Sequence, residues 1–98
     1  MASIDVPVLQ WPDKDPNEVL DYNLDWTARL AGDTISTSTW TIDSDQLLVI
    51  NSQTFAATNS TVWLSGGTVG TMYDCKNQIM TAAGRTMDQS VLLQITQK

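Results

Sequence analysis

The chain has 98 residues, a formal net charge of −6, one cysteine and no histidine. This length is enough for one domain with its own core and leaves no room for a second. The acidic balance argues against direct binding to nucleic acid, and the lack of histidine removes the common zinc sites and the usual general base near neutral pH.

The charge is distributed unevenly along the chain. Residues 1–50 carry nine acidic side chains against Lys14 and Arg29, a balance of −7, whereas residues 51–98 have a balance of +1. We interpret this as a solvated acidic face. Head-to-tail contact between copies and contact with a basic partner surface remain open alternatives.

Residues 1–19 are predicted to form an extended N-terminal arm. Prolines at positions 7, 12 and 16 remove amide donors and exclude a helix. The arm still holds more apolar side chains than a disordered tail usually has, namely Ile4, Val6, Val8, Leu9 and Trp11. Two alternatives stay open: the arm packs along its own domain, with Trp11 covering a sheet edge, or it reaches a neighbouring subunit.

Residues 20–98 are predicted to form a β-sandwich domain. Apolar and polar side chains alternate from Leu20 to Trp26, which is the period of a strand buried on one face. Residues 27–31 form either a short turn of helix or a bent continuation of this strand. A turn at 31–34 then leads to a strand at 35–42, in which Trp40 is expected to be the central core tryptophan.

Further strands are expected at 47–50, at 55–58 as an edge strand, at 60–65, at 72–81 and at 86–96, with a polar connector at 51–54. Gly66-Gly67 ends one strand and residues 82–84 form a hairpin loop. Side chains expected to face the core in the last two strands are Tyr73, Cys75, Ile79, Val91, Leu93 and Ile95. About seven strands at these intervals are typical of an all-β, immunoglobulin-like β-sandwich.

No motif in the chain predicts a catalytic, cofactor-binding or metal site. Cys75 is interpreted as a small core residue, because no basic group on its strand faces the same way. Residues 21–25 resemble the opening of a calcium loop, but Trp26 and Gly32 stand where that loop needs glycine and glutamate. We therefore expect no enzyme activity, no cofactor and no small-molecule substrate.

Neither a membrane span nor an export signal is expected. No apolar run has the length to cross a bilayer, and the first ten residues lack a basic region followed by an apolar one. We expect the mature chain to be the whole chain, with no membrane partner.

Trp63 is out of phase with its neighbours Val62 and Leu64, so its strand presents the indole to solvent or to a covering subunit. Quenching of its fluorescence by sugar would indicate a lectin, whereas quenching on assembly would indicate an interface. The candidate interface residues are Val8, Leu9, Trp11, Pro12 and Trp63.

Short motifs follow one another in a fixed order from Lys14 to Ile95: Asp15-Pro16 with Val19-Leu20-Asp21-Tyr22, Asp25-Trp26, Gly32-Asp33-Thr34-Ile35, Trp40, Trp63-Leu64-Ser65-Gly66-Gly67, and Gly84-Arg85 with Ser90. In this order and spacing the chain resembles the phage fiber-tail adaptors, a family of small β-sandwich virion components. It differs from them most at residues 44–58.

The resemblance implies a structural virion protein of a tailed bacteriophage, an adaptor in the tail or neck region that joins fiber or tail proteins. It implies a homo-oligomer that contacts other phage structural proteins and is assembled in the bacterial host cytoplasm. The alternative is a capsid decoration protein or a host-surface glycan-binding domain with the same immunoglobulin-like fold.

Overall fold

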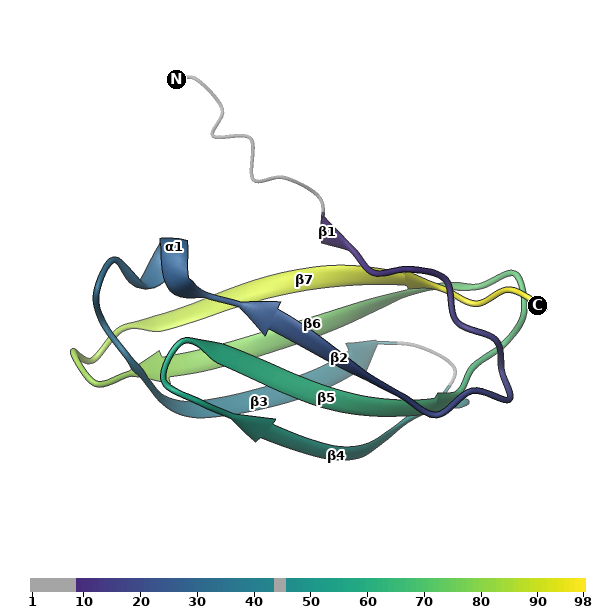
Figure 1. Cartoon of the computed structure of the whole chain (residues 1–98), viewed down its shortest axis with the longest axis horizontal. Helices are drawn as coiled ribbons and strands as arrows, with labels where there is room; N and C mark the ends of the chain where they lie inside the picture. Colours follow the sequence, from purple (N-terminus) through teal and green to yellow (C-terminus); the bar gives the residue numbers. More distant parts are fainter. Residues whose placement is uncertain (1–8, 44–45) are drawn as a thin grey trace, which may run out of the picture.

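Residues 9–43 and 46–98 are described by the computed structural model, in which two β-sheets face each other (Figure 1). The four-stranded sheet has the order β1-β7-β6-β3 and the three-stranded sheet the order β2-β5-β4. The elements are β1 (Leu9–Gln10), β2 (Leu20–Asp25), α1 (Thr27–Leu30), β3 (Ile35–Asp43), β4 (Leu48–Phe55), β5 (Asn59–Gly66), β6 (Met72–Thr81) and β7 (Thr86–Gln94). The predicted all-β class with two layers is confirmed.

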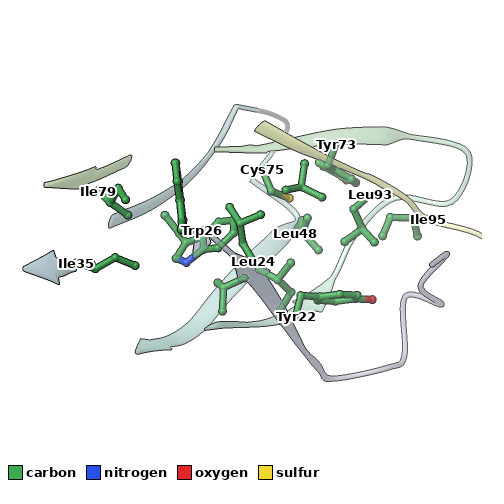
Figure 2. Close-up of a cluster of buried hydrophobic side chains, with 14 of the residues drawn as sticks. Tyr22, Leu24, Trp26, Ile35, Leu48, Tyr73, Cys75, Ile79, Leu93 and Ile95 are labelled. Carbon is green, nitrogen blue, oxygen red and sulfur yellow. The ribbon is translucent and has the colours of Figure 1, made fainter. Parts of the chain in front are cut away.

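The core lies between the two sheets and follows the alternation seen in the sequence (Figure 2). Every second side chain of β2, β6 and β7 points inward, because successive side chains of a strand face opposite ways. Trp26 and Trp40 are both buried, as predicted. Six predicted core residues are also buried: Tyr73, Cys75, Ile79, Val91, Leu93 and Ile95.

The structure of residues 47–58 differs from the prediction. A polar connector at 51–54 and a separate edge strand at 55–58 are wrong, because one strand runs from Leu48 to Phe55 and pairs with β5 throughout. A register shift between Ile50 and Ser52 places Asn51 in a bulge, which breaks the alternation of the sequence.

β1 is a short parallel partner of β7, with Leu9 opposite Val91. The amide of Trp11 continues the ladder by donating to the carbonyl of Leu92 at 3.0 Å. Donors in a parallel ladder recur at every second residue, so the donor before Leu9 would be position 7, which is a proline without an N–H. The matching acceptor on β7, the carbonyl of Asp88, instead accepts from Nη1 of Arg29 at 2.7 Å.

A chain of buried polar side chains joins the two sheets inside the core. Nε1 of Trp26 donates to Oδ1 of Asn77 at 2.9 Å, and Nδ2 of Asn77 donates to Oγ of Ser38 at 2.8 Å. Oγ of Ser38 lies 2.7 Å from Oγ of Ser60, which also accepts from Nε1 of Trp40 at 2.8 Å. Because each group is satisfied only in this arrangement, the chain fixes how one sheet sits on the other.

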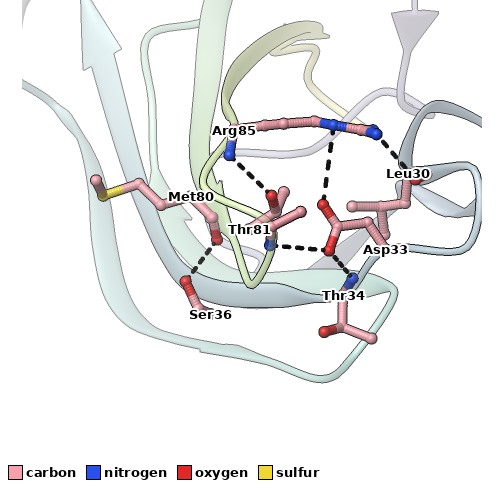
Figure 3. A network of polar contacts seen from close by, with 8 residues as sticks. Leu30, Asp33, Thr34, Ser36, Met80, Thr81 and Arg85 are labelled. Carbon is pink, nitrogen blue, oxygen red and sulfur yellow. Dashed lines mark hydrogen bonds and ion pairs between the residues drawn. The ribbon is translucent and has the colours of Figure 1, made fainter.

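A second polar cluster closes one end of the sandwich (Figure 3). Oδ1 of Asp33 accepts from the amides of Thr34 at 2.8 Å and Ala83 at 3.2 Å. Nε of Arg85 forms an ion pair with Oδ2 of Asp33 at 4.0 Å, and Nη1 of Arg85 donates to the carbonyl of Leu30 at 3.4 Å. The loop before β3 is thereby attached to the β6–β7 hairpin.

Candidate interaction surface

The four predicted interface residues that the structure describes lie in separate parts of the molecule. Leu9, Trp11 and Pro12 run along the side of the sandwich where β1 and β2 are the edges of their sheets. Trp63 lies in β5, the central strand of the three-stranded sheet, with its side chain on the outer face. Val8 lies outside the described residues. The structure therefore groups Leu9 with Trp11 and Pro12, and places Trp63 on another surface.

Trp11 closes the seam between the two sheets. Its ring stacks on Tyr22 with centroids 4.6 Å apart, and it lies 5.5 Å from the ring of Trp40. Nε1 of Trp11 donates to the carbonyl of Asn23 at 3.4 Å. The described end of the arm, from Leu9 onward, thus packs along its own domain.

Tyr22 lies beneath Trp11 and is almost fully buried. Its hydroxyl has no hydrogen-bond partner in the described part of the chain. Burial, followed by the nearby negative charge of Glu18, raises the pKa of Tyr22 to about 12. The phenol is neutral over the whole physiological range, and its position in the seam is apolar in character.

Lys14 is a buried cation next to this seam. Its Nζ donates to the carbonyls of Gly66 at 2.7 Å and Asp15 at 2.9 Å, and its side chain is fully buried. Burial lowers the pKa of Lys14, because the charged form loses its hydration. The side chain ties the segment before β2 to the end of β5, a role for which the sequence offered no signal.

The outer face of the three-stranded sheet is centred on Trp63; we call it the Trp63 face. Trp63 is 41% exposed and lies between Asp21 of β2 and Ser52 of β4, its partners across the ladder. Within the single chain the indole is therefore on the surface, and whether another subunit covers it stays a prediction. Other outward side chains on this face are Asn23, Asp25, Val49, Asn51, Thr54, Thr61 and Ser65.

The Trp63 face has two chemically different margins. β2 contributes carboxylates, Asp21 and Asp25, whereas β4 contributes only uncharged groups. Hydrogen bonds between outward side chains hold parts of the face in place, since Thr61 Oγ1 donates to Asn23 Oδ1 at 3.0 Å. An exposed indole on a rigid strand, surrounded by polar groups, is typical of the centre of a protein interface.

The described residues show few features of a catalytic or metal-binding site. Among them, no group of three side chains that could ligate a metal ion comes together. Cys75 is fully buried and burial raises the pKa of its thiol to about 12, which confirms the prediction of a core residue. In the same part of the chain, no helix is both long and apolar enough to cross a membrane.

Comparison with protein families gives a direct result. Residues 14–94 match the family described as podophage GP4 fiber-tail adaptor protein gp77. The chain belongs to this fiber-tail adaptor family. No curated protein matches the chain.

The matched region of the fiber-tail adaptor begins at Lys14 and ends at Gln94, the last residue of β7. It contains β2 to β7 and the buried Lys14, and it leaves out β1 and Trp11. The family is one of structural phage adaptors, so the chain has a structural role in a bacteriophage. The Trp63 face lies entirely within the matched region.

Proposed function

We propose that this fiber-tail adaptor is a virion protein of a tailed bacteriophage that joins other structural proteins in the tail or neck region. The observation that carries the proposal is the family match over residues 14–94, which includes every strand of the sandwich except β1. A rigid two-layer domain with an exposed aromatic face suits a part that holds two neighbours at a fixed distance. Assembly would take place in the host cytoplasm.

The domain is proposed to be an immunoglobulin-like sandwich. In that fold the second, fifth and fourth strands share one sheet, and the third, sixth and seventh share the other. The observed orders β2-β5-β4 and β7-β6-β3 agree with this arrangement, whereas β1 pairs with β7 in the other sheet. The predicted division into an arm of residues 1–19 and a domain of residues 20–98 is kept as part of the proposal.

The adaptor is proposed to act in several copies and to contact its neighbours through Trp63 and through Val8, Leu9, Trp11 and Pro12 of the arm. Tryptophan is enriched at interface centres because one side chain removes a large apolar area from water. The polar groups around Trp63 suit a hydrated rim. Pro12 is exposed beside Trp11, so a neighbour could approach the seam there.

The test is to locate the adaptor in intact particles by electron microscopy and to repeat the assembly with Trp63→Ser. We expect density in the tail or neck, and we expect the variant to fold but to enter particles about tenfold less, as the loss of an interface hot spot predicts. Met80→Ser is the matched control, since Met80 is also a large exposed apolar side chain but lies on β6 in the other sheet. Density on the capsid surface, or normal incorporation of Trp63→Ser, would contradict the proposal.

One observation favours a second candidate, a glycan-binding or capsid-decorating domain. The indole of Trp63 is flanked by the carboxylate of Asp21 and the hydroxyl of Ser52, and such a platform can stack on a sugar ring and bond its hydroxyls. Quenching of Trp63 fluorescence by host-surface glycans, lost in Trp63→Ser, would support this function in place of the first.

A further inference from the structure

The sheets have four edges, and three of them are occupied by side chains of the same chain. One edge is β1 together with the part of β7 that β1 does not cover, where Arg29 donates to the carbonyl of Asp88. Trp11 binds the carbonyl of Asn23 on β2, as described above. The third edge is β3, where the amide of Trp40 donates to Oε1 of Gln53 at 3.0 Å. Such contacts keep an edge strand from pairing with another chain.

The fourth edge is β4, which forms the lower margin of the molecule in Figure 1. Among the described strands β4 pairs with β5 only. It contains neither a charged side chain nor a proline, and no charged residue occurs anywhere from position 46 to position 73. Val49 is 48% exposed and Phe55 is 45% exposed, near its two ends. An uncharged edge of this length is a template for strand pairing on either side of the bulge at Asn51.

The hydrogen bonds of the β4–β5 hairpin show which peptide groups are open. The amide of Ala56 donates to the carbonyl of Asn59, so the hydrogen-bonded pairs toward β5 fall at 54 and 52. Gln53 and Phe55 then direct their N–H and C=O groups away from β5. Beyond the bulge, the bond from Gly67 N to Leu47 O places the peptide groups of residues 48 and 50 outward in the same way.

We propose that β4 pairs with β4 of a second copy in antiparallel orientation, which joins two three-stranded sheets into one continuous sheet across a two-fold axis. The choice of a second copy follows from charge. Each chain carries −6, so copies repel over most of their surfaces, but this edge brings no like charges opposite each other.

Geometry also suits a second copy. A two-fold contact needs a surface that is complementary to itself, and an antiparallel pair of identical strands meets that need. It also brings Val49 of one copy toward the Phe55 end of the other. This contact goes beyond the proposed function, because it uses neither the Trp63 indole nor the arm.

The test compares Thr54→Lys with Thr39→Lys in the full chain by sedimentation equilibrium over a range of concentrations. Thr54 is exposed on the outer face of β4 and its backbone pairs with Thr61 of β5, so lysine leaves the fold intact. We expect a dimer for the native chain and about a tenfold or greater loss of dimer affinity for Thr54→Lys. Trp63→Ser should keep the native dimer affinity, which separates the β4 edge from the Trp63 face that also contains Thr54. Thr39 is exposed on β3, and its change to lysine adds the same charge without affecting the dimer.

Amide hydrogen exchange gives a second readout that does not depend on a variant. The N–H groups of Gln53 and Phe55 should exchange more slowly as the protein concentration rises. Deletion of residues 1–8 should leave the dimer unchanged. A monomer at every concentration, a dimer that survives Thr54→Lys, a dimer that is lost with residues 1–8, or a strand of another virion protein on β4 of a monomeric chain would each overturn the proposal.

Discussion

Tyr22 combines two features that seldom occur together, an apolar stacking role and a buried hydroxyl without a partner in the described part of the chain. A hydroxyl that loses its water without gaining a hydrogen bond costs about 1–3 kcal/mol. The ring is thus favourable for stability, and the oxygen is not.

Tyr22→Phe is therefore expected to raise the free energy of unfolding by about 1 kcal/mol at pH 7. The pKa of Tyr22 rises from 10.0 to about 12 on folding, because the folded state favours the neutral phenol. The stability that comes from this preference is fully present below pH 10 and is lost as the pH rises toward 12. The native chain should lose stability over that range more steeply than the variant. Urea unfolding at pH 7 and pH 11 measures both effects, and the buried Cys75 thiol adds the same pH dependence to each protein.

Tyr73→Phe is the control and should act in the opposite direction. The hydroxyl of Tyr73 accepts from the amide of Thr68 at 2.8 Å, so its removal takes away this hydrogen bond and costs about 1–2 kcal/mol. A stabilised Tyr73→Phe, or a destabilised Tyr22→Phe, would contradict our account of the two hydroxyls.

Single residues show where sequence patterns succeed and where they fail. The alternation around Trp26 and Ile95 predicted burial correctly, since apolar side chains reveal their face by period alone. Lys14 and Asn77 could not be predicted as buried. A polar side chain is buried only when its partners are in place, and those partners are the carbonyl of Gly66 and the indole of Trp26, which lie far away in the sequence.

At the scale of elements, the end of β5 depends on glycine. Gly66 has φ of +78°, and a Cβ there would overlap the carbonyl oxygen of Leu47, which already accepts from the amide of Gly67. Gly70, in the loop before β6, has φ of +87° with open space around the position of a Cβ. Both backbones disfavour other residues, but only Gly66 also has a steric reason.

We expect Gly66→Ala to lower the free energy of unfolding by about 2–4 kcal/mol, because β4, β5 and the Lys14 contact would all have to shift. Gly70→Ala should cost about 1 kcal/mol, from backbone strain alone. Thermal or urea denaturation of the two variants measures the difference. Equal losses would mean that the overlap with Leu47 is relieved at no cost.

Elements differ in how well the sequence predicts them. β6 has the bounds expected from the sequence, since both its period and its flanking glycines are clear. Only the start of β4 was predicted, as the strand at 47–50, because the bulge and the solvent-facing run of polar residues that follow hide the alternation. β1 is too short to have a period, and only the position of β7 makes it a strand.

At the scale of the whole molecule, the C-terminal residues are tied to the segment between β1 and β2. The amide of Thr96 donates to the carbonyl of Lys14 at 2.9 Å, and the amide of Lys98 donates to Oδ2 of Asp15 at 2.8 Å. Nζ of Lys98 lies 3.1 Å from Oε1 of Glu18. The pKa of Asp15 is lowered chiefly by the amide of Lys98, and that of Glu18 by the amide of Asp15 and then by Lys98.

Removal of Lys98 should therefore raise the pKa of Asp15, for which the Lys98 amide is the largest cause, more than that of Glu18, for which Lys98 comes second. Above their ordinary pKa values both carboxylates are charged and stabilise the contact with Lys98. This stabilisation is lost as the pH falls through the lowered pKa values of the folded chain. Carboxyl NMR titration of the two proteins measures the shifts. Asp25 is the internal control, since its pKa is lowered by Thr27, and an unchanged Asp15 would mean that the end of the chain is not held in solution.

The candidate surface was predicted only in part. The phase of Trp63 against its neighbours was enough to place it outside the core, but its distance from Trp11 depends on which strands become neighbours. A sequence pattern assigns a side chain to a face of its own strand. It does not say which strand lies beside it, so the grouping of Asp21 and Ser52 around Trp63 had to come from the structure.

The parallel pairing of β1 with β7 has a mechanical consequence. If a neighbour pulls on the arm while another holds the opposite end of the chain, the two strands slide along each other in shear. The bonds of Trp11 and Lys14 to the carbonyls of Leu92 and Gln94 then bear the load together instead of opening one after another. An adaptor built in this way resists tension along its length far better than force applied across its sheets.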